Sequence, residues 1–316
     1  FKLNSKSYVI EIASNDGYLL KNFIASGIPC LGIEPTSSTA DAAEALGIPV
    51  LREFFGGDLG SRLANKNMQA DLVLGNNVYA HVPDINDFTV GLTKVLKSRG
   101  VVTLEFPHVL RLLEENLFDT IYHEHFSYLS LHTARRIFEQ AGLKIWDVES
   151  LSTQGGSLRI YGCHSYDSRQ ISASVQEVLA EEQSNGLKQL STYLGFQERV
   201  DRVKTRLLLY LTEQKRAGKM VVAYGAAAKG NTLLNYAGIT PDLISFVCDA
   251  APSKQGKYMP GSHIPIFPPS MLYEQKPDII LILPWNLAEE VTSQNAYVRE
   301  WGGEFVTAIP QIRIIN

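Results

Sequence analysis

Short apolar runs alternate with helical segments between residue 8 and about residue 162. We expect buried strands, in chain order, at 8–13, 29–34, 70–76 and 100–106, where the letters read YVIEIA, PCLGIE, ADLVLGN and GVVTLEF. Helical spacing of apolar residues predicts helices between them at 18–27, 37–47 and 87–100, each ending in glycine, a frequent helix stop. This alternation is typical of an open, mostly parallel sheet covered by helices.

The pattern changes and then returns in the second half of the chain. Residues 143–151 and 155–164 predict a late pair of strands at an antiparallel edge, and residues 168–217 show only helical spacing. Buried-strand runs then recur at 219–226, 243–249, 278–285 and 303–310, with helices expected at 229–238 and 288–302. We therefore expect an α/β protein with a first Rossmann-like domain at 1–165, a helical connector at 166–217 and a second Rossmann-like α/β domain at 218–316.

Composition narrows the possible functions. The 316 residues are 45% hydrophobic and 20% charged, which suits a globular chain of two domains. A net charge of −4 without a basic run argues against nucleic acid as a partner. Three scattered cysteines exclude a disulfide framework or a zinc ribbon, and no apolar run has the length of a membrane span, so we expect a cytoplasmic protein. Because the chain starts at Phe1, we also expect a fragment of a longer protein.

The end of the first strand carries candidate ligand-binding residues. Glu11 ends the strand, and Asn15, Asp16 and Gly17 form a turn of small residues before the next helix. Ligands of wound sheets bind at the carboxyl ends of such strands, where glycine allows close approach to the backbone. Glu34 ends the second strand and can accept both hydroxyl hydrogens of a ribose. In the alternative interpretation, the hydrogen bonds of the Glu11 carboxylate are satisfied within the protein, and Glu34 is a solvated charge in a loop.

The order and spacing of these features resemble class I S-adenosylmethionine-dependent methyltransferases. This resemblance implies that the glycine turn faces the methionine part of the cofactor and that Glu34 holds its ribose. Phe54, in the stretch REFFGG, lies where a further strand should end after the one at 29–34, and its ring can lie there against adenine or pack in the core. Asn76, in the stretch ADLVLGN, is a further candidate for contact with the cofactor.

The stretch FDTIYHEHFSYLS, residues 118–130, concentrates histidines after the strand at 100–106, which we count as the fourth. On an extended segment, His123 and His125 would point the same way and could share a metal with His81 or His108. Proton transfer is the second interpretation, with His125 as base, Glu124 orienting its ring and Tyr122 stabilising an oxyanion. A structural corner packed on Phe126 and Tyr128 is the third.

Five stretches together resemble the nucleotide-sugar C-methyltransferases, which methylate a carbon beside the ketone of a TDP-4-keto-deoxysugar. They are VIEIASNDGYLL, GNNVYAHVPD, FDTIYHEHFSYLS, GGSLRIY and YGAAAKGNTLLNYAG. The resemblance implies S-adenosylmethionine as the cofactor, His125 as the base and Tyr122, Glu124 and His81 in the same site. It also implies an N-terminal cysteine-rich zinc domain that these residues do not include, so we expect no metal in this chain. Gln154 stands where the family has histidine before GGS.

Candidate substrate contacts lie in both halves. Lys229 and Asn231 follow a strand and a small-residue turn, which is a ready site for a pyrophosphate. Arg159 can pair with a phosphate or with a structural carboxylate, and Ser157 and Asn77 are further candidates. We expect a nucleotide sugar as the small-molecule partner, no membrane and a monomer or homodimer. The alternatives are an NAD(P)-dependent oxidoreductase, whose spaced-glycine turn is missing, and a non-catalytic module that binds S-adenosylmethionine.

Overall fold

The computed structural model describes residues 1–315, which form two compact units. The first unit comprises Phe1–Leu110 and Glu124–Lys188, and the second comprises Arg111–His123 and the residues from Gln189 onward. Among the described residues, no helix combines the length and the apolar character needed to cross a membrane.

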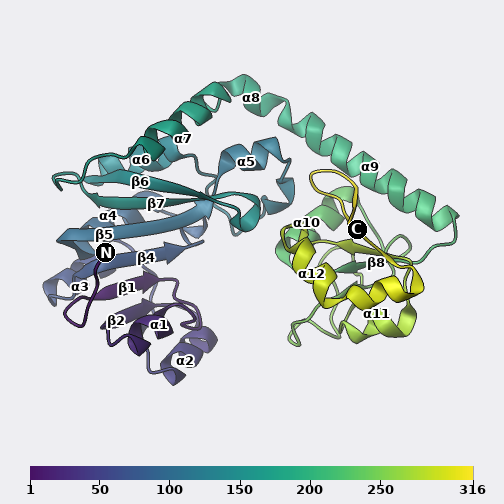
Figure 1. Cartoon of the computed structure of the whole chain (residues 1–316), viewed down its shortest axis with the longest axis horizontal. Helices are drawn as coiled ribbons and strands as arrows, with labels where there is room; N and C mark the ends of the chain where they lie inside the picture. The colour runs from purple at the N-terminus through teal and green to yellow at the C-terminus, as the bar shows by residue number, and fades with distance from the viewer. Residues whose placement is uncertain (316) are drawn as a thin grey trace. The chain divides into compact units, whose positions relative to one another are not determined.

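The first unit contains a seven-stranded sheet in the order β3-β2-β1-β4-β5-β7-β6 (Figure 1). All strand pairs from β3 to β5 are parallel, whereas β7 is antiparallel to both β5 and β6, which confirms the expected late antiparallel pair. The strands are β1 (Val9–Ile12), β2 (Cys30–Ile33), β3 (Val50–Leu51), β4 (Ala70–Asn76), β5 (Leu96–Pro107), β6 (Leu143–Leu151) and β7 (Ser157–His164). Because β3 is a short strand of its own, the strand that we counted as the fourth is the fifth.

Helices cover this sheet, and two of them stop where the sequence indicated. The chain passes through Gly27 and Gly47, both with positive φ, just after α1 and α2 end. The expected helix over 87–100 is wrong at its end, because α4 stops at Val95 and β5 begins at Leu96. A Cβ on Gly100 would lie 2.8 Å from the carbonyl oxygen of Ala70, so this glycine permits a close strand approach. The helices are α1 (Leu20–Ala25), α2 (Ser37–Ala45), α3 (Gly57–Asn65), α4 (Ile85–Val95), α6 (Leu131–Gln140) and α7 (Ala173–Ser184). A further helix, α5 (Val109–Glu114), begins in the first unit and passes into the second at Arg111.

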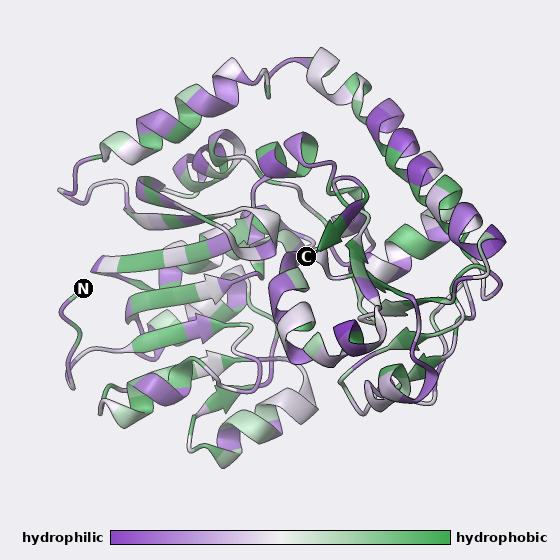
Figure 2. Cartoon of the chain, turned by 45° about the vertical axis from the view of Figure 1, so that its right-hand side comes forward, coloured by the Kyte–Doolittle hydropathy of each residue, from purple (hydrophilic) through white to green (hydrophobic). Residues whose placement is uncertain are grey.

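The second unit contains a six-stranded sheet in the order β10-β9-β8-β11-β12-β13, with only β13 antiparallel. Figure 2 shows that hydrophobic residues concentrate in the strands of both sheets. The strands are β8 (Val221–Tyr224), β9 (Val247–Cys248), β10 (Ile266–Phe267), β11 (Ile279–Ile282), β12 (Glu304–Thr307) and β13 (Arg313–Ile315). The helices are α8 (Leu190–Leu194), α9 (Phe196–Arg216), α10 (Ala228–Ala237), α11 (Ser270–Gln275) and α12 (Ala288–Gln294).

Two expectations for this unit need correction. The strand expected at 243–249 is limited to β9, because only Val247 and Cys248 pair with neighbouring strands. The α-helix expected at 288–302 ends at Gln294, and a 3₁₀ helix, Ala296–Trp301, continues the chain.

The second sheet repeats most of the first. Its order β10-β9-β8-β11-β12-β13 corresponds to β3-β2-β1-β4-β5-β7 in position and in direction. The carboxyl ends of β8 and β9 are therefore the counterparts of the carboxyl ends of β1 and β2. Both places are where a wound sheet binds ligands.

Candidate active site

The turn after β1 is strained and closely packed. Ala13 and Asn15 have φ of 56° and 53°, and Gly17 has φ of 77°. A Cβ on Gly17 would lie 2.3 Å from Cδ1 of Ile48, so this glycine lets the turn pack against the chain that follows α2. Asn15 and Asp16 are exposed on the same turn.

Glu34 fixes this turn from the end of β2. Its Oε2 accepts a hydrogen bond from the backbone N–H of Asn15 (3.1 Å), and its Oε1 accepts one from the backbone N–H of Thr36 (2.8 Å). Glu34 is buried, yet it also lines a cavity. Because each carboxylate oxygen has two lone pairs, both oxygens can still accept a hydroxyl hydrogen from a ligand.

Glu11 lies on β1 and is only 2% exposed. Its Oε2 has no hydrogen-bond partner, and neither has the nearby hydroxyl of Ser14. Burial raises the pKa of Glu11 to about 8, so its carboxyl group is largely protonated at neutral pH. It does not line the cavity, which sets it apart from Glu34.

The cavity has a volume of about 610 Å³, which suits a ligand of the size of a nucleoside derivative. Phe54 is 86% exposed on its wall, whereas Phe55 packs edge-on against Phe88 with ring centroids 5.2 Å apart. Neither Asn76 nor Asn77 lines it, and the backbone N–H of Asn77 donates to the carbonyl of Glu105. The lining consists of Ile12, Ala13, Ile33, Glu34, Pro35, Glu53, Phe54, Phe55, Val78, His81, Val82, Pro83, Asp84, Phe88 and Phe126.

The structure brings two of the predicted histidines together beside this cavity, although only His81 lines it. His81 lines the wall, and its ring lies 4.6 Å, edge to face, from the ring of His125. The ring of Tyr128 lies 6.1 Å from that of His125. The backbone N–H groups of Phe126 and Ser127 both donate to the carbonyl of Ala80, which ties the His125 segment to the residues beside His81.

The rest of the histidine stretch differs from the expectation. Residues 122–124 form a bend and a turn, so the extended segment that would align His123 with His125 is wrong. His123 and Glu124 are exposed, Tyr122 is half-buried, and His108 is buried elsewhere against Glu182. Among residues 1–315, no group of three or more histidine, cysteine, aspartate or glutamate side chains is arranged to hold a metal ion.

Arg159 and Ser157, expected to bind substrate, have partners within the protein. Arg159 pairs with Glu105 (2.8 Å) and Glu149 (3.3 Å), which is the structural alternative that the sequence left open. Ser157 is buried and donates to the carbonyl of Thr153. Gln154 has a φ of 55° within the 3₁₀ turn Thr153–Gly155.

Lys229 lies in a half-buried polar cluster of the second unit. Its Nζ donates to Asn286 (3.1 Å) and lies 4.9 Å from the ring centroid of Trp285, and burial lowers its pKa. The indole N–H of Trp285 donates to Asp119 (2.7 Å), whose pKa burial raises to about 6. Sequence reasoning missed Asp119, which is 0% exposed, because its partner lies 166 positions away along the chain.

A second cavity, of about 270 Å³, lies at the carboxyl end of β8. Asp249, directly after β9, accepts hydrogen bonds from the backbone N–H groups of Ala226 (2.7 Å) and Ala251 (2.8 Å), as Glu34 does in the first unit. Sequence reasoning missed Asp249, although the same signal, an acidic residue at the end of a buried strand, had identified Glu34. The lining consists of residues 226–228 and of Asn231, Ser253, Lys254, Lys257, Tyr258, Met259, Pro260 and Ile266.

This fold, with a carboxylate-braced turn at the mouth of its first cavity, defines a class I S-adenosylmethionine-dependent methyltransferase. Residues 1–148 match a family described as a methyltransferase domain, and residues 152–310 match the C-methyltransferase C-terminal domain. The chain belongs to the C-methyltransferase family and is an S-adenosylmethionine-dependent C-methyltransferase. The C-methyltransferase NovU of Streptomyces niveus is 35% identical over 314 residues, which are 99% of this chain and 75% of NovU.

Solved structures of other methyltransferases are less similar to this chain than NovU is. A putative methyltransferase in a complex with the Haloferax volcanii Trm112 activator is 14% identical, with a TM-score of 0.42 over 52% of this chain and 84% of that chain. Magnesium protoporphyrin IX methyltransferase of Synechocystis PCC 6803 with bound S-adenosylmethionine is also 14% identical. Its TM-score is 0.38 over 50% of this chain and 70% of that one.

Proposed function

We propose that this enzyme methylates a carbon beside the ketone of a TDP-4-keto-deoxysugar, with His125 as the base that removes the proton. The observation that carries the proposal is the His125 ring held against His81 at the wall of the first cavity. Histidine titrates near neutral pH and can therefore accept a proton there. The similarity to NovU over nearly the whole chain supports C-methylation as the reaction.

A carbon beside a ketone becomes a nucleophile only when its proton is removed and the enolate oxygen is stabilised. We assign proton removal to His125 and stabilisation of the oxygen to the hydroxyl of Tyr122. S-adenosylmethionine supplies an electrophilic methyl group when it is bound. The residues of the cavity must then hold the carbon and the methyl group in line, about 3 to 3.5 Å apart.

The proposed base is oriented by its neighbours. The edge-to-face contact of His81 limits rotation of the His125 ring, and the hydrogen bonds of Phe126 and Ser127 to Ala80 limit movement of the backbone. Glu124 is exposed on the preceding turn. We infer that Glu124 orients the ring of His125 and does not itself remove the proton.

The residues of the first cavity fit the cofactor. We propose that Glu34 accepts the ribose hydroxyls and that adenine lies on the exposed ring of Phe54. Glu34 and Asp84 give the cavity a negative wall, which suits a ligand that carries a sulfonium and an ammonium group, whereas Glu53 is paired with Arg62. We assign the methionine part to the turn of Asn15, Asp16 and Gly17, with Glu11 beneath it and Asn76 at the end of β4.

We propose that the second unit binds the nucleotide of the substrate. The lining of its cavity contains Lys257, which suits a diphosphate, and Lys254, which pairs with Asp249 (3.1 Å). Asn231 lines the same cavity with a buried Oδ1 that has no partner, so it can accept a hydrogen bond from the nucleotide. Lys229 lies deeper against Trp285, and we assign it to the support of this region.

Because Cys30, Cys163 and Cys248 are free thiols, we propose a cytoplasmic enzyme.

His125→Asn tests the base. Incubated with S-adenosylhomocysteine and the keto sugar in deuterated water, the wild-type enzyme should exchange the proton beside the ketone. His125→Asn should lose both this exchange and methylation but bind S-adenosylhomocysteine normally, because asparagine cannot act as a base near neutral pH. Tyr122→Phe should slow both steps by a factor of about 100 to 1000. Mass spectrometry of the recovered sugar measures both.

The matched control is His123→Asn, which changes an exposed histidine of the same stretch and should retain both activities. Exchange that continues unchanged in His125→Asn would exclude His125 as the base. Wild-type protein that binds S-adenosylhomocysteine but never exchanges the proton would indicate a binding module.

A further inference from the structure

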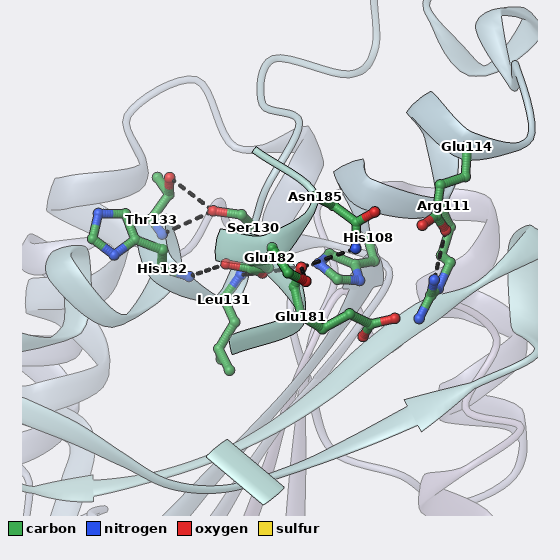
Figure 3. A network of polar contacts seen from close by, with 11 residues as sticks. His108, Arg111, Glu114, Ser130, Leu131, His132, Thr133, Glu181, Glu182 and Asn185 are labelled. Atoms are coloured by element: carbon green, nitrogen blue, oxygen red, sulfur yellow. Dashed lines mark hydrogen bonds and ion pairs between the residues drawn. The ribbon is translucent and has the colours of Figure 1, made fainter. Parts of the chain in front are cut away.

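A buried carboxylate in the first unit lies far along the chain from every residue discussed as catalytic. Glu182 is on α7 and is 2% exposed. Figure 3 shows its carboxylate between His108 and the first turn of α6. A buried carboxylate is costly unless hydrogen bonds satisfy it, so its partners indicate why it is there.

Glu182 has three donors. His108 donates from Nε2 to Oε1 (2.9 Å), because an ionised carboxylate can only accept, and the backbone N–H of Leu131 donates to the same oxygen. The backbone N–H of His132 donates to Oε2 (3.0 Å). These amides begin α6, where the helix dipole also favours a negative charge. Glu182 therefore fixes the end of β5 and the start of α6 with one side chain.

The same region fixes the end of the His125 segment. His108 pairs with Leu129 in an isolated parallel bridge, and the backbone N–H of Val109 donates to the carbonyl of Leu129 (3.0 Å). At its other end the segment is held by the carbonyl of Ala80. Both anchors therefore follow His125 closely in the chain, at residues 126–127 and at Leu129, and the second of them depends on Glu182.

We propose that Glu182 is a positioning residue for His125, acting through His108 and the first amides of α6. This inference rests on the proposed role of His125 as the base. Without the carboxylate, the amides of Leu131 and His132 and the ring of His108 lose their common acceptor inside the protein. The loop would then sample several positions, and His125 would meet the substrate proton less often.

Glu182→Gln tests the proposal in the full chain, because glutamine keeps the size of the side chain but replaces one acceptor oxygen with a donor. We expect kcat to fall by about 10- to 100-fold, since a displacement of about 1 Å costs rates of this order. The KM for the keto sugar and the affinity for S-adenosylhomocysteine should stay within about threefold of the wild-type values. General destabilisation would not lower kcat while leaving these two quantities unchanged. Hydrogen exchange of the backbone amides of residues 126–132 should become at least about tenfold faster, while that of β1 and β4 should not change.

Glu177→Gln is the matched control, because Glu177 is exposed on the same helix. If Glu182→Gln proves insoluble, His108→Asn removes one of the three contacts and takes its place in the same measurements. If Glu182→Gln has the same kcat and the same rates of amide exchange as Glu177→Gln, the proposal is overturned. A fall in kcat together with an equally large rise in KM and an equally large loss of cofactor affinity would also overturn it, because that result would indicate damage to the fold. Activity retained in His125→Asn would overturn the base assignment, and the amide exchange would then show separately whether Glu182 holds the loop.

Discussion

At the scale of the residue, the most unusual carboxyl group is Glu11, because burial keeps it protonated. Its pKa is about 8, against an ordinary value of 4.5. The unfolded chain releases this proton above pH 4.5, whereas the folded protein retains it up to about pH 8. The contribution of Glu11 to folding stability therefore falls from pH 4.5 to pH 8 and is constant above that range.

Glu11→Gln should remove this slope. Glutamine is neutral at every pH, so the variant should be more stable than wild type by about 4 to 5 kcal/mol at pH 8, with the difference disappearing near pH 4.5. Urea unfolding at a series of pH values, without cofactor, measures it. The same pH dependence in wild type and variant would mean that Glu11 is charged in the folded protein.

The sequence identified individual residues best where their signal was local. Glu34 ends a predicted strand and His81 follows another closely, and both line the first cavity. Glu182 and Asp119 could not be found in this way, because their partners lie 50 to 166 positions away. A glutamate on an amphipathic helix gives no sign in the sequence that it is buried.

At the scale of the element, the turn after β1 depends on a residue of a different strand. Glu34 accepts the N–H of Asn15 and lines the cavity, so it both shapes the turn and faces the ligand. Glu34→Ala should weaken binding of S-adenosylmethionine by about 1.5 to 3 kcal/mol, as for a lost hydrogen bond to a charged group. Titration calorimetry measures the loss.

Glu53→Ala is the control for this change. Glu53 lines the same cavity, but it pairs with Arg62 at the surface and should contribute much less. If both variants bind the cofactor as tightly as wild type, the ribose is held elsewhere.

Element boundaries were harder to predict than elements. Residues 96–100 have helical spacing, yet Leu96 pairs with Ala70 and belongs to β5, because strand pairing outweighs local preference. The turn at residues 122–124 was missed for a similar reason. The sequence has no glycine or proline there, and the segment is fixed by contacts of its neighbours with Ala80 and His108.

At the scale of the whole molecule, two similar sheets have cavities of opposite charge. Glu34 and Asp249 brace corresponding turns, but acids line the first cavity and lysines the second. This difference agrees with a cationic cofactor in one unit and an anionic nucleotide in the other.

Lys257→Glu should therefore weaken binding of TDP by about 5- to 30-fold, since a reversed charge near a phosphate costs on the order of 1 to 2 kcal/mol. Affinity for S-adenosylhomocysteine should not change. Lys219→Glu, at an exposed lysine outside the cavity, is the control for net charge. Calorimetry at low and high salt checks both, and equal affinity of Lys257→Glu and Lys219→Glu for TDP would place the nucleotide elsewhere.

The path of the chain also limits how this enzyme can be recombined. Residues 111–123 belong by their contacts to the second unit, although residues of the first unit flank them on both sides. A chimaera joined only at residue 189 would combine a foreign 111–123 segment with the native α10 and Trp285. The indole would then lose Asp119, and Tyr236 would lose the ring of Phe118, which lies 5.2 Å away. A functional chimaera between relatives must therefore take residues 111–123 and the residues from 189 onward from the same parent, so we expect these two segments to be inherited together.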